Sequence, residues 1–216
     1  MTLTAMIVKM SEGLGRTCAI FFLTLLFSLP LGLLVALLRM SKNRVLSTVT
    51  KAIISVLRGT PLMLQLIAVA YGPFYLFGAT LLVKQKLLAI IIAFALNYAA
   101  YFAEIYRGGI ESMPVGQYEA AHVLGYSKTQ TFMRIILPQV VKRILPSVTN
   151  EVITLVKDTS MAFTLAYMEM FSIGKQIANS QSSFLPFIIA GAFYYLMNSV
   201  VAFGMSRIEK KLSYYR

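Results

Sequence analysis

The sequence predicts an all-α integral membrane protein with five transmembrane helices. Hydrophobic residues make up 58% of its 216 residues and charged residues only 13%, whereas about a quarter of the residues of a soluble domain are charged. The apolar residues occur in long runs, and none of these runs shows the two-residue alternation of a barrel strand. Within lipid, a run of this kind must form a helix, because a helix satisfies its own backbone hydrogen bonds.

The apolar runs are long enough to cross a bilayer. A helix rises about 1.5 Å per residue, so about 20 residues cross a hydrocarbon core of about 30 Å. Four runs, 17–38, 59–83, 87–103 and 176–206, contain no charged residue, and a fifth, 144–168, is apolar apart from Glu151, Lys157 and Asp158. We therefore expect one transmembrane domain over residues 1–216, with spans at 15–38, 59–82, 87–106, 144–168 and 184–206.

The positions of lysine and arginine predict the orientation of these spans. If the N-terminus is outside, fourteen of these residues, Arg216 among them, lie on the inner side and only five lie on the outer side. The outer five are Lys9, Arg16, Lys84, Lys86 and Lys175. Since the side richer in lysine and arginine is normally cytoplasmic, we expect an external N-terminus and a cytoplasmic C-terminus.

The composition and motifs exclude several chemistries. One cysteine and one histidine leave no internal disulfide and no Cys/His zinc cluster, and we expect no metal site and no catalytic residue. No glycine-rich nucleotide loop ending in Gly-Lys-Ser/Thr occurs, so the chain is not expected to be an enzyme. The net charge of +12 does not indicate nucleic-acid binding, because the basic residues lie between apolar runs.

The segment 107–143 is a cytoplasmic loop longer than a helix hairpin requires. Pro114 and Gly116 break the chain, and residues 117–124 are good helix formers that Gly125 can close in the left-handed conformation. Ser127 can cap a second helix that runs to Pro138. We therefore expect a helix, a glycine corner and a second helix on the cytoplasmic face.

This loop resembles that of the membrane permeases of ATP-binding-cassette (ABC) importers. Their motif is Glu-Ala-Ala, three residues, Gly, nine residues, Ile, one residue, Leu-Pro, and the chain matches it at seven places: Glu119, Ala120, Ala121, Gly125, Ile135, Leu137 and Pro138. The resemblance extends over nearly the whole chain and looks closest to the polar amino-acid branch. That branch is similar in Arg58-Gly59-Thr60-Pro61, in the stretch from Ala103 to Gly109, and in Lys157-Asp158-Thr159-Ser160.

The resemblance implies a type I importer permease in a bacterial inner membrane, with several partners. It implies that Glu119, Ala120, Ala121 and Gly125 form a coupling helix that sits in a groove of a separate ATPase dimer. It also implies a second permease copy, with a homodimer favoured over a related subunit, and an extracytoplasmic substrate-binding protein. The cargo would be an amino acid, and ATP and magnesium would be bound by the ATPase.

Polar residues within two spans predict a substrate site. Glu151 and Asp158 lie seven residues apart, on one helix face with Thr154 between them, and Asn97 and Tyr101 share a face of the third span at similar depth. We expect these two faces to meet, with hydrogen bonds from residues of the span 87–106 and negative charge from residues of the span 144–168. The full candidate set is Asn97, Tyr98, Tyr101, Glu151, Thr154, Asp158, Thr159, Ser160 and Met161.

Several alternatives remain open at this stage. Asp158 can simply neutralise Lys157, and Glu104 can pair with Arg107, as structural ion pairs without substrate contact. Two acids against one base slightly favour cationic amino acids (arginine, lysine, histidine) over glutamine. A secondary transporter with carboxylates for ion coupling, or a membrane scaffold that transports nothing, are the competing functions.

Overall fold

The computed structural model describes residues 2–212, so Arg216 lies outside the described residues. These residues form α1 (Leu3–Arg39), α2 (Arg44–Gly59), α3 (Leu62–Phe77), α4 (Leu81–Lys84), α5 (Lys86–Glu111), α6 (Val115–Val123), α7 (Lys128–Thr131), a π-helical turn (Phe132–Ile136), α8 (Leu137–Asp158), a 3-10 segment (Thr159–Leu165), α9 (Met170–Gln181) and α10 (Leu185–Leu212). The predicted all-α class is confirmed.

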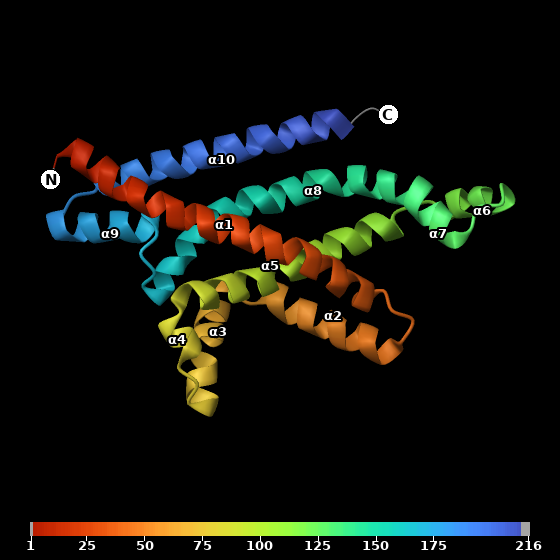
Figure 1. Cartoon of the computed structure of the whole chain (residues 1–216), viewed down its shortest axis with the longest axis horizontal. Helices are drawn as coiled ribbons and strands as arrows, with labels where there is room; N and C mark the ends of the chain where they lie inside the picture. The colour runs from red at the N-terminus through yellow and green to blue at the C-terminus, as the bar shows by residue number, and fades with distance from the viewer. Residues whose placement is uncertain (1, 213–216) are drawn as a thin grey trace.

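The long helices form an elongated bundle in which α5 is central. In Figure 1, α1, α5, α8 and α10 run along the long axis, with α9 beside the N-terminus and α6 and α7 at the opposite end. The most extensive packing is between α1 and α5, and α5 also contacts α2, α3 and α8. The main core lies among these helices and includes Phe21, Leu66, Phe94, Phe102 and Leu155. The bundle therefore holds α5 against the elements that carry the expected functional residues.

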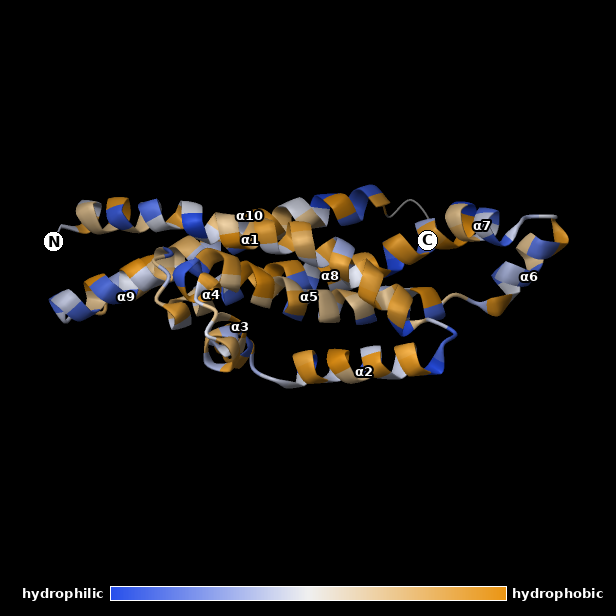
Figure 2. Ribbon diagram, turned by 60° about the horizontal axis from the view of Figure 1, so that its bottom comes forward, coloured by the Kyte–Doolittle hydropathy of each residue, from blue (hydrophilic) through white to orange (hydrophobic). Residues whose placement is uncertain are grey.

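Three helices, α1, α5 and α10, are long and apolar enough to cross a membrane, and the pair α2 and α3 passes the same test together. This pair is bent by 110° between Gly59 and Leu62. The expected span 59–82 is not one helix, because α3 ends at Phe77 and Gly78 follows it in the left-handed conformation. Hydropathy colouring in Figure 2 shows that α2 lies at the edge of the bundle. The expected span 144–168 comprises the second part of α8, which ends at Asp158, and the 3-10 segment after it, so it is not one continuous α-helix.

The bend between α2 and α3 follows from Pro61. A residue before proline is disfavoured in the helical conformation, and Thr60 is extended (φ −117°, ψ 148°). The bend frees backbone carbonyl groups, which would be costly in lipid without partners. The Gln65 amide supplies them, since Nε2 donates to Leu57 O at 2.7 Å and to Thr60 O at 3.1 Å. One side chain thus stabilises the bend.

The second helix of the cytoplasmic loop does not end at Pro138, contrary to expectation. Ser127 caps α7 as expected, in a capping box with Gln130, but the chain continues from α7 through the π-helical turn into α8. Within this turn Leu137 N donates to Phe132 O, five residues earlier. The wider turn accommodates the proline ring, which would clash with a carbonyl group in a regular helix. The loop is therefore continuous with α8, the helix in which the expected span 144–168 begins.

A glycine in α1 allows α9 to pack closely against it. A Cβ atom at Gly13 would lie 2.7 Å from Met170 Cα and 2.8 Å from Met170 N, whereas a Cβ at Gly15 would meet nothing within 4 Å. Backbone atoms of α9 cannot move aside as a flexible side chain can. Gly13 is thus the position in α1 at which α9 tolerates no larger residue.

We predict that Gly13→Ala lowers the thermal stability of the detergent-solubilised protein, by the roughly 1–3 kcal/mol typical of overpacking. Gly15→Ala is the matched control in the same helix, and it should leave stability unchanged or slightly higher, because alanine favours helix. The measurement is the midpoint temperature of unfolding for both variants. Equal midpoints would contradict the close packing of α1 on α9.

Candidate functional site

A hydrogen bond between α5 and α8 is the centre of the candidate site. Tyr98 Oη donates to Asp158 Oδ2 at 2.8 Å. Tyr98 is buried with 2% of its surface exposed, and Asp158 is half-buried at the last residue of α8. The contact between the two helices is thus made by Tyr98, which is adjacent to the face that carries Asn97 and Tyr101.

Tyr101 and Arg58 extend this centre toward α2. The Tyr101 ring lies 6.3 Å from the Tyr98 ring, and the Arg58 guanidinium carbon lies 5.0 Å from the Tyr101 ring centroid. Glu151 is close enough to interact electrostatically with both Arg58 and Asp158. In the sequence Arg58 stands out only as part of a motif, because nothing local to α2 indicates that it reaches α5. The site thus contains a cation as well as two acids.

Asn97 precedes Tyr98 in the chain, but its side-chain amide forms hydrogen bonds with α2 and α3. Its Nδ2 donates to Leu57 O at 3.2 Å and to Gln65 Oε1 at 3.0 Å. Only 5% of the residue is exposed. Asn97 therefore completes the polar network that stabilises the bend between α2 and α3, and its amide group faces α2 and α3.

The remaining candidate residues of the expected span 144–168 differ in their surroundings. Glu151, Thr154, Ser160 and Met161 are half-buried, whereas Thr159 is fully buried. The hydroxyl groups of Thr159 and Ser160 donate to the backbone carbonyls of Val156 and Lys157, respectively. These bonds stabilise the transition from α8 to the 3-10 segment. Of these side chains, Glu151 lies within electrostatic reach of both Tyr98 and Asp158.

The structure also bears on the two ion pairs that the sequence left open. Glu104 pairs with Arg107 at 2.6 Å and lies 3.9 Å from Arg39, so it is a structural link at the inner end of α1 and α5. Lys157 is exposed, and the hydrogen bond recorded for Asp158 comes from Tyr98. The ion-pair interpretation therefore describes Glu104, whereas Asp158 accepts a hydrogen bond from Tyr98 and also lies within electrostatic reach of Lys157.

The loop between α5 and α8 presents an exposed tip. Glu119 and Ala120 are exposed, whereas Ala121 packs inward with 1% of its surface exposed. Gly125 closes α6 with φ +80°, the left-handed conformation expected of it. Beside it, Val123 and Leu124 are 86% and 74% exposed. The tip therefore carries an acid and apolar side chains that no other part of residues 2–212 covers.

Two sets of polar contacts join α8 to its neighbours, one to α6 at the tip and one to the end of α5. Gln117 on α6 and Gln139 on α8 exchange hydrogen bonds at 2.9 and 2.8 Å. Arg143 Nη1 donates to Ser112 O at 2.6 Å and so joins α8 to the end of α5. A force on α6 can therefore be transmitted directly to the helix that carries Glu151 and Asp158.

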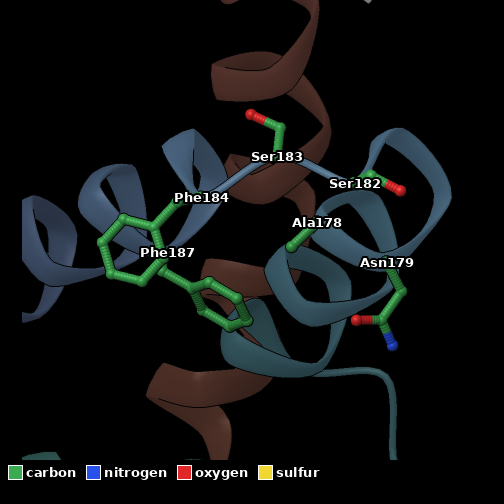
Figure 3. Close-up of a pocket in the computed structure, with 6 residues that line it drawn as sticks. All are labelled: Ala178, Asn179, Ser182, Ser183, Phe184 and Phe187. Carbon is green, nitrogen blue, oxygen red and sulfur yellow. The ribbon is translucent and has the colours of Figure 1, made fainter.

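A hollow of about 380 Å³ lies at the other end of the molecule, where α9 turns into α10 (Figure 3). It is lined by Ala178, Asn179, Ser182, Ser183, Phe184 and Phe187. It contains none of the expected substrate residues, so it is separate from the candidate site. Among the described residues, no group of three or more His, Cys, Asp or Glu side chains is placed to hold a metal ion.

Comparisons with known proteins identify the family. Residues 28–214 match the binding-protein-dependent transport system inner membrane component family. The chain is 36% identical to the nopaline transport system permease protein NocM of Agrobacterium fabrum, covering 90% of this chain and 83% of the relative. It is also 36% identical to the L-cystine transport system permease protein TcyB of Bacillus subtilis, covering 95% and 87%.

Solved structures agree with these relatives. An amino acid ABC transporter solved with histidines superposes with a TM-score of 0.85 at 31% identity, covering 96% of this chain and 94% of that chain. The MetNI methionine ABC transporter shares the fold, with a TM-score of 0.77 at 20% identity, covering 99% and 100%.

The chain belongs to the binding-protein-dependent transport system inner membrane component family. Within this family it is the permease subunit of an amino-acid ABC importer of the polar amino-acid branch, and it lies in the inner membrane as a multi-pass protein. Permease subunits of these systems are not catalytic; a separate ATPase subunit and a substrate-binding protein are their partners.

The placement of Asn97 generates a prediction that separates structure from substrate contact. Asn97→Leu removes two hydrogen bonds at the bend, so it should lower the stability of the permease by roughly 1–3 kcal/mol and leave the ratio of uptake among amino acids unchanged. Gln65→Leu removes the partner side chain, and the double variant should cost less than the sum of the single variants. Thermal unfolding and competitive uptake measure these effects; an altered uptake ratio for Asn97→Leu would place its amide in the substrate site instead.

Proposed function

We propose that this chain forms the substrate path for a polar amino acid, with cationic amino acids (arginine, lysine, histidine) favoured over glutamine. The observation that supports this most directly is the half-buried Asp158 carboxylate held by Tyr98 between two helices. Carboxylates within membrane spans are costly and generally face a cavity or a partner. Here the site is only half covered by its own chain, which leaves room for a ligand.

The three charged groups of the site suit the three charged groups of a cationic amino acid. Asp158 binds the α-amino group, and Arg58 binds the α-carboxylate through guanidinium N–H groups, which remain available when the cation stacks on the Tyr101 ring. Glu151 is then free to bind a cationic side chain. A neutral side chain such as that of glutamine would leave this second carboxylate without an opposite charge, and this difference is the basis of the proposed preference.

The remaining assignments concern orientation and assembly. The N-terminus lies outside and the C-terminus in the cytoplasm. Two identical copies enclose the path, since the half-buried faces of Tyr101, Glu151 and Asp158 need a second subunit to cover them. The extracytoplasmic binding protein delivers the amino acid on the outer side.

The coupling of transport to ATP hydrolysis is assigned to the exposed tip of the loop. Glu119, Ala120, Ala121 and Gly125 form the element that docks on an ATPase dimer, which binds ATP and magnesium. Small alanine side chains permit a close approach, and exposed Glu119 offers a charge to the partner. The hydrogen-bonded Gln117–Gln139 pair transmits movement of the tip to α8.

The experiment that tests this function is ATP hydrolysis by the permease copurified with its ATPase in lipid vesicles, with the binding protein and a panel of amino acids. We expect stimulation by cationic amino acids above that by glutamine, and Glu119→Arg should abolish stimulation by reversing the docking charge. Glu12→Arg reverses a charge far from the loop and serves as the control. Failure of the two subunits to copurify, with transport intact, would instead support a secondary transporter.

A further inference from the structure

Helix α2 carries a row of polar and basic side chains along one face. We call this row the basic stripe, and it consists of Arg44, Thr48, Lys51, Ser55 and Arg58. The spacing of three or four residues places all five on one side of the helix. Every one of them is exposed. The stripe therefore runs over the whole length of α2 without cover from the described part of the chain.

The other two faces of α2 are a face that packs on the bundle and a face that is apolar and exposed. One face meets the bundle: Ile54 packs with Ala36 and Ala100, and Arg39 Nη1 donates to Ser47 Oγ at 3.0 Å. The next face is apolar and exposed, with Val45, Val49 and Val56 at helical spacing. An apolar exposed face is suited to lipid or to another apolar surface. The basic stripe is not suited to lipid or to an apolar surface, so it must face a polar environment.

The stripe extends from the middle of the membrane toward the cytoplasm. Leu57 O accepts a hydrogen bond from Asn97, and Asn97 is near the midpoint of α5 between Lys86 and Arg107. At about 1.5 Å per residue, Lys51 lies about 10 Å and Arg44 about 21 Å from the level of Arg58. A cation at the depth of Arg58 avoids lipid and faces water or a partner charge.

The end of the stripe at Arg58 lies next to the candidate substrate site. Arg58 stacks on Tyr101, whose ring is next to that of Tyr98, the donor to Asp158. The opposite end reaches Arg44, which follows the turn at the cytoplasmic end of α1. A continuous polar and positively charged surface thus connects the site with the cytoplasmic side.

We propose that the basic stripe lines the aqueous release path of the importer and guides the carboxylate group of the substrate from the site to the cytoplasm. The second copy of the permease closes the other side of this path. The identity of the substrate rests on the proposed function, but the water exposure and charge of the stripe do not.

The test uses single cysteines in the assembled importer with Cys18→Ser as background, since Cys18 is the one native cysteine. Ser55→Cys lies on the stripe, and Val56→Cys lies on the apolar face as the matched control. Anionic and cationic thiosulfonate reagents are added to the cytoplasmic side of inside-out vesicles. We expect Ser55→Cys to react at least about 10-fold faster than Val56→Cys with the anionic reagent, and to favour the anionic over the cationic reagent.

Charge reversal one helical turn away tests the electrostatic part. Adding Lys51→Glu to Ser55→Cys should invert the preference between the two reagents, whereas adding it to Val56→Cys should change little. Equal rates at Ser55→Cys and Val56→Cys, or an unchanged preference after reversal, would overturn the proposal. So would rates that depend on anionic lipid content, which would indicate that the stripe binds lipid headgroups. Because these rates require no transport, an incorrect substrate assignment leaves this test intact.

Discussion

The structure depends on one constraint: polar groups placed within the membrane must find partners inside the protein. At the bend between α2 and α3, Gln65 and Asn97 satisfy the carbonyl groups that Pro61 sets free. Between α5 and α8, Tyr98 holds Asp158. Each polar contact joins two elements that apolar packing alone would leave free to slide. The same contacts therefore fix the bundle and assemble the candidate substrate site around α5.

This arrangement gives the permease a mechanical connection between site and loop. Helix α7 leads through the π-helical turn into α8, which ends at Asp158. Gln139 on α8 holds α6 through Gln117, and Arg143 holds the end of α5. A movement of the docked loop would therefore act on both helices that contribute to the Tyr98–Asp158 pair. The π-helical turn required by Pro138 is what makes this continuity possible.

Much of this organisation follows from local patterns in the sequence. Apolar runs predict the helical class, and the left-handed Gly125 and the Ser127 cap depend on neighbours within a few residues. The role of Asn97 could not be predicted, because its partners Leu57 and Gln65 are distant in sequence. Arg58 was overlooked as a site residue for the same reason. The helix break expected at Pro138 was wrong because a proline next to a widened turn can be accommodated, and only the three-dimensional backbone shows that turn.

The most direct test of the central claim is competitive uptake by the reconstituted importer carrying Asp158→Asn or Glu151→Gln, with arginine and glutamine as competing substrates. If Asp158 binds the amino group shared by all amino acids, Asp158→Asn lowers uptake of both substrates, by about 10-fold or more for loss of a charge-assisted hydrogen bond. If Glu151 binds the cationic side chain, Glu151→Gln lowers uptake of arginine and spares glutamine. Unchanged uptake of both substrates in both variants would contradict the account.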